Sequence, residues 1–234
     1  MNFSDKNILI IGASSGIGHA LATQLEAAGA TLFVASRRQP ANISATFIEW
    51  DATQPITNQF DALPDVIHGL VYCPGSINLR PFNRLSADDF KQDFQLNVLG
   101  AVAVIQSNLT RLKKANGGSV VMFSTVAART GMGFHATVAT AKSAVEGLTV
   151  SLAAEYANAK IRFNAIAPSL TDTPLAGALL ATDEKRDASN KRHPLGRVGT
   201  SQDLANTAAF LLSDDSSWMT GQVLRVDGGM GNLK

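Results

Sequence analysis

The sequence predicts a single α/β domain built on a doubly wound parallel sheet. Short apolar runs, typical of buried strands, alternate with segments of helical periodicity along the whole chain. A glycine-rich turn links the first apolar run to the first helical segment. No linker or change of composition divides the chain, so residues 1–234 are interpreted as one domain.

Composition restricts the class of protein. The chain of 234 residues is 45% hydrophobic and 17% charged, which is typical of a globular rather than a disordered protein. A net charge of +1 gives no reason to expect a nucleic acid or an anionic membrane as partner. The N-terminus lacks the pattern of a signal peptide, and the single Cys73 fits a reducing compartment. We therefore expect a cytoplasmic protein with no membrane span.

The first strand and helix enclose the glycine-rich turn. The predicted strand Asn7–Ile11 leads into the turn GASSGIG at residues 12–18, and a helix follows that ends at Gly29. Small residues in such a turn let the backbone approach a pyrophosphate, and the helix N-terminus offers free N–H groups. The turn therefore predicts a Rossmann-type dinucleotide site, although a purely structural tight turn has the same composition.

The ends of the next two strands bear on the choice of cofactor. The predicted strand Leu32–Ser36 ends in Arg37 and Arg38, where an NAD site usually has an acidic residue. Arginine can grip the 2′-phosphate of NADP, so these residues favour NADP over NAD, unless both are ordinary surface arginines. The predicted strand Ala45–Trp50 precedes Asp51, which is interpreted either as an acceptor for the adenine amino group or as a turn residue.

The middle of the chain predicts a short connection, a buried strand and a long helix. Residues 52–65 contain two prolines and predict an abbreviated connection, and Val66–Tyr72 predicts a strand that closes in the turn CPGS. Ser86 and the acidic residue three positions later fit a helix cap. Helical spacing then continues over Phe90–Lys114 and places the polar Asn97 inside the helix.

The second half repeats the alternation of strand and helix. Ser119–Ser124 predicts a strand, and after the loop Ala127–Thr137 a long helix carries Lys142 to about Ala157. Residues 175–200 are polar and poorly periodic, which suits a mobile lid over a substrate. The remaining predicted elements are the strand Ile161–Ala167, a hydroxyl-rich loop over residues 168–174, the helix Ser201–Ser213 capped by Ser201, and the strand Val223–Val226.

From end to end, the chain resembles a short-chain dehydrogenase/reductase. Any one of its motifs alone would be weak, but their order and spacing over nearly the whole length carry the resemblance. The motifs are Gly12-x3-Gly16-x-Gly18, Asp51, the turn ending in Gly75, Asn97 in NVLG, Lys142 in AKSAVEGLT, IRFNAIAPSLTDTP and TGQVLRVDGG.

The resemblance implies hydride transfer between NAD(P) and a carbonyl or alcohol carbon. Family members use a tyrosine as acid and base, a serine that binds the reacting oxygen, a lysine and an asparagine. Asn97 and Lys142 match the last two, and Thr125 stands at the serine position, where Ser124 could substitute only after a one-residue shift of the loop. The tyrosine position is occupied by Val138, which cannot transfer a proton.

The resemblance also assigns cofactor contacts and a homodimer or homotetramer, and it requires no metal. The pyrophosphate residues are Gly12, Ser14, Ser15, Gly16, Ile17 and Gly18. Arg37 and Arg38 correspond to the 2′-phosphate, Asp51 to the adenine, and Gly75 and Lys142 to the ribose. The nicotinamide contacts are Pro168, Leu170 and Thr173.

The missing phenol leaves the proton donor open. One candidate is His135, near the start of the helix that carries Val138, because imidazole suits proton transfer near neutral pH. A second is a water molecule held by Lys142 and Asn97. The other histidines are interpreted as structural or surface groups, except that His193, on the lid, is a candidate for contact with the substrate.

Two functions remain on the sequence alone. The first is an NADP(H)-dependent oxidoreductase that acts on a small carbonyl or alcohol with an altered proton donor. The second is a catalytically silent NADP(H)-binding sensor or structural subunit. Retention of Asn97 and of a hydroxyl at Thr125 favours the enzyme, because cofactor binding alone needs neither.

Overall fold

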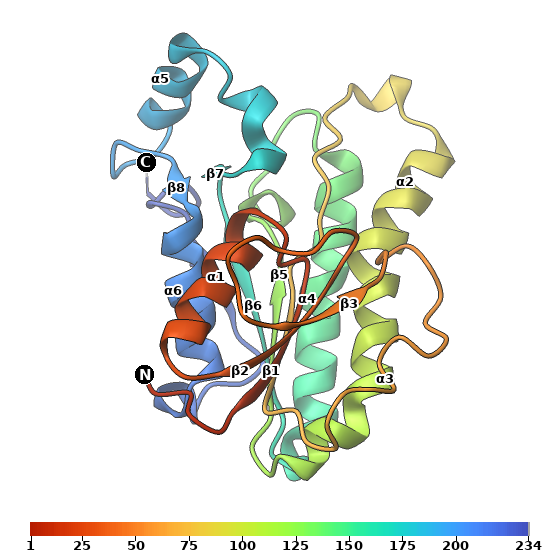
Figure 1. Cartoon of the computed structure of the whole chain (residues 1–234). Coiled ribbons are helices and arrows are strands. Elements are labelled where there is room, and N and C mark those ends of the chain that lie inside the picture. The colour runs from red at the N-terminus through yellow and green to blue at the C-terminus, as the bar shows by residue number, and fades with distance from the viewer. Residues whose placement is uncertain (234) are drawn as a thin grey trace.

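A seven-stranded sheet, with every strand parallel to its neighbours, forms the centre of the computed structural model, which describes residues 1–233 (Figure 1). The strand order is β3-β2-β1-β4-β5-β6-β9, and β7 and β8 pair separately. The strands are β1 (Asn7–Ile11), β2 (Thr31–Ser36), β3 (Thr46–Glu49), β4 (Gly69–Tyr72), β5 (Ser119–Phe123), β6 (Arg162–Pro168), β7 (Thr171–Asp172), β8 (Gly199–Thr200) and β9 (Val223–Val226).

Helices cover both faces of this sheet. They are α1 (Gly16–Ala27), α2 (Ala87–Phe94), α3 (Gly100–Lys114), α4 (Ala136–Tyr156), α5 (Asp183–Lys191) and α6 (Ser201–Leu212). Ile8 and Ile10 of β1 pack with α1 and α6, whereas Leu9 and Ile11 pack with α3 and α4. A strand covered on both sides has no polar face, which explains the continuous apolar run of β1. The predicted single-domain Rossmann-type fold is confirmed.

The topology places a ligand site above β1 and β4. From β1 the chain proceeds outward to β2 and β3, and it then returns to β4 on the other side of β1. In open α/β sheets ligands bind outside the carboxyl ends of the strands at such a reversal. The glycine turn after β1 and the CPGS turn after β4 both lie at this edge.

The glycine turn has the geometry that its residues predict. Gly12 and Gly16 adopt positive φ angles of 85° and 58°, which favour glycine. A Cβ atom at Gly18 would lie 2.3 Å from the Gly12 carbonyl oxygen, so only glycine permits this approach of α1 to β1. The predicted end of α1 is also confirmed, because Gly29 has a φ of 88°.

The predicted helix over residues 90–114 is interrupted. Ser86 and Asp89 form the expected capping box of α2, but a π-helical segment, Gln95–Leu99, separates α2 from α3. Asn97 lies within this segment and is buried. Residues 52–65 form no helix, as predicted.

The segment 175–200 is more regular than its sequence predicts. It contains most of the short helix η5 (Pro174–Leu179) and all of α5. Helix α6 follows with a capping box formed by Thr200 and Asp203, so the cap is Thr200 and not the predicted Ser201. Across residues 1–233, no helix is both long enough and apolar enough to cross a membrane.

Candidate functional site

Two adjoining hollows lie at the carboxyl ends of the central strands. A groove of about 480 Å³ follows the glycine turn and the ends of β2, β3 and β4. A cavity of about 490 Å³ lies between the ends of β5 and β6, the start of α4 and the segment 175–200. The two hollows share lining residues, so they form one site; these residues are Ile17, Cys73, Gly75, Thr173 and Leu175.

The groove collects most of the residues predicted to bind a dinucleotide. Its walls include Gly12, Ser14, Ser15, Gly16, Ile17, Gly18, Arg37, Asp51, Gly75 and Thr173. At the N-terminus of α1, Ser15 makes no side-chain cap and the first turn has no acidic residue. The first N–H groups of this helix are therefore free to bind an anion, which fits a pyrophosphate.

The two arginines after β2 differ in position. Both side chains are exposed, but Arg37 lines the groove and Arg38 does not. Both residues lie in a bend directly after β2, so the path of the chain there decides that Arg37 and not Arg38 lines the groove. The Ser36 hydroxyl donates to the Arg38 carbonyl oxygen at 2.7 Å.

Asp51 lines the groove but also closes a turn. Its Oδ1 accepts hydrogen bonds from the Thr53 backbone N–H at 2.8 Å and from the Thr53 hydroxyl at 2.7 Å. These bonds lower the pKa of Asp51, and the charge of Arg37 adds to the effect. Both interpretations of Asp51, as a turn residue and as a groove acceptor, are therefore compatible with its position.

The cavity brings together Thr125, His135, Val138 and Lys142, and the predicted nicotinamide contacts Pro168 and Leu170 also line it. The Val138 side chain is buried in its wall. Neither of the two tyrosines lines the cavity: the Tyr72 hydroxyl donates to the Leu96 carbonyl oxygen, and Tyr156 packs on Phe163. No phenol within residues 1–233 therefore reaches this cavity.

Thr125 retains the hydroxyl position at the end of β5. Its Oγ1 donates to the Pro168 carbonyl oxygen at 3.5 Å and accepts from the Ala127 N–H at 3.3 Å. The neighbouring Ser124 hydroxyl donates to the buried Glu146 carboxylate at 2.8 Å. Because Ser124 is held by Glu146, it does not take the place of Thr125.

Lys142 and Asn97 meet beside Gly75. A Cβ atom at Gly75 would lie 3.5 Å from both the Asn97 Oδ1 and the Lys142 Nζ, so glycine leaves this space open. Burial lowers the pKa of Lys142 to about 8, against opposing effects of Cys73 and Asp93. Asn97 is 1% exposed and its Oδ1 has no hydrogen-bond partner within the described chain. An unpaired buried acceptor beside an ammonium group fits a ribose hydroxyl or an ordered water.

Sequence reasoning missed two polar neighbours of Asn97. The Ser76 hydroxyl donates to the buried Asp93 carboxylate at 2.5 Å. The Asn97 amide donates to the Ser76 Oγ at 3.1 Å and to the Asp93 carbonyl oxygen at 2.8 Å. These bonds orient the amide and leave its Oδ1 on the side of Gly75. Their positions in the sequence were the signal that could have identified these two neighbours. Asp93 stands four residues before Asn97, about one helical turn away, and Ser76 directly follows Gly75.

His135 is the histidine at the cavity wall. Its Nδ1 lies 2.6 Å from the Gly133 carbonyl oxygen and therefore donates to it, which leaves Nε2 as the remaining ring nitrogen. His19 hydrogen-bonds the Ala41 carbonyl, and His68 accepts from the Asn7 N–H, as expected of structural groups.

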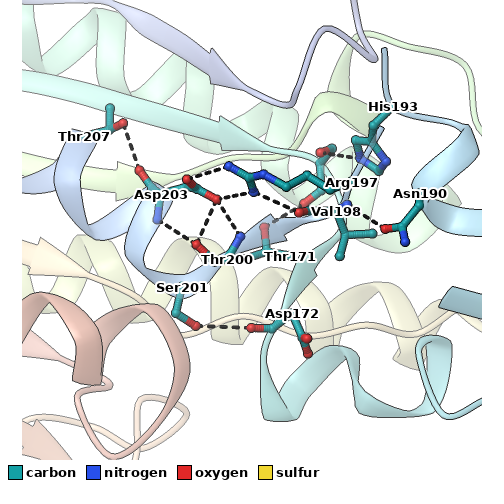
Figure 2. A network of polar contacts seen from close by, with 11 residues as sticks. Thr171, Asp172, Asn190, His193, Arg197, Val198, Thr200, Ser201, Asp203 and Thr207 are labelled. Atoms are coloured by element: carbon teal, nitrogen blue, oxygen red, sulfur yellow. Dashed lines mark hydrogen bonds and ion pairs between the residues drawn. The ribbon is translucent and has the colours of Figure 1, made fainter. Parts of the chain in front are cut away.

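His193 belongs to a polar network that ties the segment 175–200 to the sheet (Figure 2). Its Nδ1 donates to the Ser189 carbonyl oxygen at 2.8 Å, so Nε2 accepts from the Ser169 hydroxyl at 2.8 Å. His193 is buried and does not line the cavity, but Ser169 does. Figure 2 shows further anchors: the Asn190 side chain accepts from the Val198 N–H, and Arg197 makes two hydrogen bonds to Asp203.

Comparison with known proteins identifies the family. The family model described as enoyl-(acyl carrier protein) reductase matches residues 12–231. The chain is 31% identical to 2,3-dihydro-2,3-dihydroxybenzoate dehydrogenase of Escherichia coli, over 98% of each chain. It is 30% identical to a 3-oxoacyl-[acyl-carrier-protein] reductase of Aquifex aeolicus, over 95% of this chain and 96% of that protein.

Solved structures agree with this result. The gluconate 5-dehydrogenase of Burkholderia cenocepacia, in complex with NADP and tartrate, superposes with a TM-score of 0.92 at 27% identity, over 100% of this chain and 98% of that one. A short-chain dehydrogenase/reductase of Mycobacterium ulcerans gives a TM-score of 0.89 at 30% identity, over 100% and 92% of the two chains. The chain belongs to the short-chain dehydrogenase/reductase family of nicotinamide-dependent oxidoreductases.

Proposed function

We propose that the protein is an NADP(H)-dependent oxidoreductase that transfers a hydride between the nicotinamide and a small carbonyl or alcohol substrate. The observation that carries the proposal is the continuous site. A dinucleotide groove opens into a cavity whose wall contains both Lys142 and Thr125. The bound cofactor supplies or accepts the hydride. The groove residues Gly12, Ser14, Ser15, Gly16, Ile17, Gly18 and Asp51 hold its pyrophosphate and adenosine.

Preference for NADP rests on Arg37. It lines the groove at the end of β2, and a guanidinium binds a phosphate through paired hydrogen bonds. Arg38 is exposed, outside the groove wall, and is assigned a secondary role at the 2′-phosphate. Fluorescence titration should give a lower dissociation constant for NADPH than for NADH, and Arg37→Gln should remove most of the difference. Tighter binding of NADH by the wild type would refute the assignment.

Within the cavity each side chain has a defined part. Lys142 and Gly75 bind the nicotinamide ribose, and Pro168, Leu170 and Thr173 position the nicotinamide ring. The Thr125 hydroxyl binds the reacting oxygen. His135, through its Nε2, gives or takes the proton, and the unpaired Asn97 Oδ1 beside Lys142 supports a bound water as a second route for that proton.

The test is NADPH oxidation with a panel of ketones, aldehydes and oxo acids. We expect turnover by the wild type, and a loss on the order of 10²–10⁴ in rate for His135→Ala if the imidazole is the donor. A loss of less than about threefold would assign the proton to the water route instead. Val138→Tyr should raise the rate, because it restores a phenol beside Lys142.

One observation favours the silent-protein alternative: Val138 makes the centre of the site apolar. A cofactor sensor or structural subunit would bind NADPH but would not oxidise it with any compound of the panel. Absence of turnover by the wild type, together with clear turnover by Val138→Tyr, would therefore establish the alternative.

The segment 175–200 is assigned as the substrate lid, since part of it forms a wall of the cavity. We further assign a homodimer or homotetramer in the cytoplasm. The exposed Val150 on α4 and the exposed Leu99, directly before α3, support subunit contacts there. Light scattering of the purified protein would measure the assembly, and a monomer at micromolar concentration would contradict it.

A further inference from the structure

One face of helix α5 forms part of the cavity wall. The lining residues from this region are Lys185, Ala188, Ser189 and Arg192. Their spacing of three, four and seven residues places them on a single face of the helix. A basic side chain therefore stands at each end of the helix face that meets the cavity.

The charge of the lining is of one sign. Its ionisable basic side chains are His135, Lys142, Lys185 and Arg192, and no aspartate or glutamate of residues 1–233 is among the lining residues. The acidic residues of α5 lie outside the lining set, as does Asp172, which pairs with Arg186 at 2.7 Å. Two buried carboxylates, Asp93 and Glu146, accept hydrogen bonds from the lining hydroxyls of Ser76 and Ser124, and Asp93 acts on the charge of Lys142. Lys185 and Arg192 have no acidic neighbour among the lining residues, so the field beside these two cations favours an anion.

Most of the remaining wall is apolar. Ile77, Leu79, Met132, Leu175 and Leu179 contribute to it together with Val138. An apolar wall with a few placed charged groups is typical of a site that binds an apolar body and orients it through one polar end. Lys185 lies in α5 and Arg192 directly follows its last residue, so both cations come from this helix and its C-cap and not from the β-strand ends.

These cations are available to a ligand. No described residue hydrogen-bonds or pairs with the Arg192 side chain, and Lys185 uses one of its three donors on the Ala178 carbonyl oxygen at 3.2 Å. The backbone beside Arg192 is held in place: Asn190 binds Val198 (Figure 2), and His193 binds Ser169 and Ser189. An anchored backbone lowers the entropic cost of holding a ligand group.

We propose that the substrate is an amphipathic anion: a carbonyl or alcohol compound with an apolar chain and a terminal carboxylate, which Arg192 and Lys185 bind at the α5 side of the cavity. The inference rests on the proposed function for the reacting end of the substrate. It adds the chemical class of the other end. Arginine is suited to this task because its planar donors match both oxygens of a carboxylate.

The experiment compares matched acids and esters. Initial rates of NADPH oxidation are measured with 5-oxohexanoate and 7-oxooctanoate and with their methyl esters, which keep the ketone and the chain but lose the charge. We expect kcat/KM to be higher for the acids by about tenfold, the size of one hydrogen bond to a charged group discounted for solvent exposure. In Arg192→Gln and Lys185→Gln this acid-to-ester ratio should fall towards one.

The neighbouring Lys191 gives a matched control. It is exposed, belongs to the same helix and does not line the cavity, so Lys191→Gln makes the same change of charge and should keep the wild-type ratio. If the acid-to-ester ratio fell equally in Lys191→Gln, the preference for acids would come from the net charge of the protein and not from Arg192 and Lys185. That result would overturn the proposal.

Calorimetric titration separates this inference from the proposed function. The same acids and esters are titrated into the protein saturated with NADP⁺. Tighter binding of acid than of ester, with no turnover of either, would refute the oxidoreductase proposal and support the anion site. Turnover with equal binding, tighter binding of the esters, or binding of neither compound would overturn the anion site.

Discussion

Replacing Gly18 with alanine tests the close approach between α1 and the end of β1. The new methyl group would lie 2.3 Å from the Gly12 carbonyl oxygen and 3.2 Å from the Ala13 Cα. Ordinary van der Waals contact begins near 3.4 Å, so the turn and the helix must separate by about 1 Å. The neighbouring atoms are backbone and cannot move aside independently.

The separation should reduce both stability and cofactor affinity. Overpacking of this kind costs about 1–3 kcal/mol, and each kcal/mol lowers the melting temperature of a chain of this size by about 2–4 °C. The N–H groups of the turn would move away from the pyrophosphate, and losing one charged hydrogen bond weakens binding by about tenfold or more. Differential scanning fluorimetry and titration of NADPH fluorescence measure the two effects.

Gly147→Ala is the matched control. Gly147 lies on the exposed side of α4, and outside the local helix no atom stands within 4 Å of the position that a Cβ atom would take. Within one protomer the same substitution there should stabilise α4 by about 0.5–1 kcal/mol, because alanine favours a helix, and should leave NADPH affinity unchanged. If Gly18→Ala bound NADPH and melted like Gly147→Ala, the steric reasoning would be refuted.

Ionisable and capping groups give three further predictions. Burial lowers the pKa of Lys142 from 10.5 to about 8, so between these values the unfolded chain holds a proton that the native protein has released, and stability rises with pH. Lys142→Met should therefore stabilise most below about pH 8, on the order of 3 kcal/mol, and urea unfolding that gave the same gain at pH 7 and pH 10 would contradict this. Asp203→Ala keeps the Thr200 cap but removes the carboxylate that accepts from the Thr200 N–H in the α6 capping box and that pairs with Arg197; it should cost about 1–2 kcal/mol and speed trypsin cleavage after Arg197, and an unchanged digestion rate would count against the anchoring role. Burial raises the pKa of Cys73 to about 12, so iodoacetamide at pH 8 should label the native protein far more slowly than the unfolded one, as mass spectrometry would show.

The glycine turn was the part of the site most open to prediction. This turn needs a particular backbone conformation and a close backbone approach, and the presence of glycine at a position indicates such a need. Gly12 and Gly16 have φ angles that favour glycine, and Gly18 has no room for a side chain. Strand and helix on either side then follow from apolar periodicity, so the fold class could be predicted as well.

Contacts made across the fold were less visible. Thr125 and Ser124 are adjacent hydroxyl residues, and the chain alone does not show that Ser124 binds Glu146. Arg37 and Arg38 present the same difficulty, since which of the two faces the groove depends on the path of the strand end. These distinctions arise from tertiary packing and carry no local signal.

Helix α5 was missed for a different reason. It is polar on nearly every face, so it has no apolar stripe from which a period can be recognised. The remaining local signal was its cap, because Thr182 accepts a hydrogen bond from the Lys185 N–H and two acidic residues follow in the first turn. The orientation of Arg192 towards the cavity depends on the anchors at the end of this helix.

The π-helical segment Gln95–Leu99 has a consequence for the engineering of this chain. A π-turn holds one residue more than an α-turn, and each residue of an α-helix advances the side chains by about 100°. Deleting one residue from the segment would make a continuous helix, but it would rotate α2 against α3 by about that angle. Asp93 would then turn away from Ser76, and the Asn97 amide would lose the contacts that orient it. Chain length at this point is therefore as much a determinant of the site as the side chains themselves.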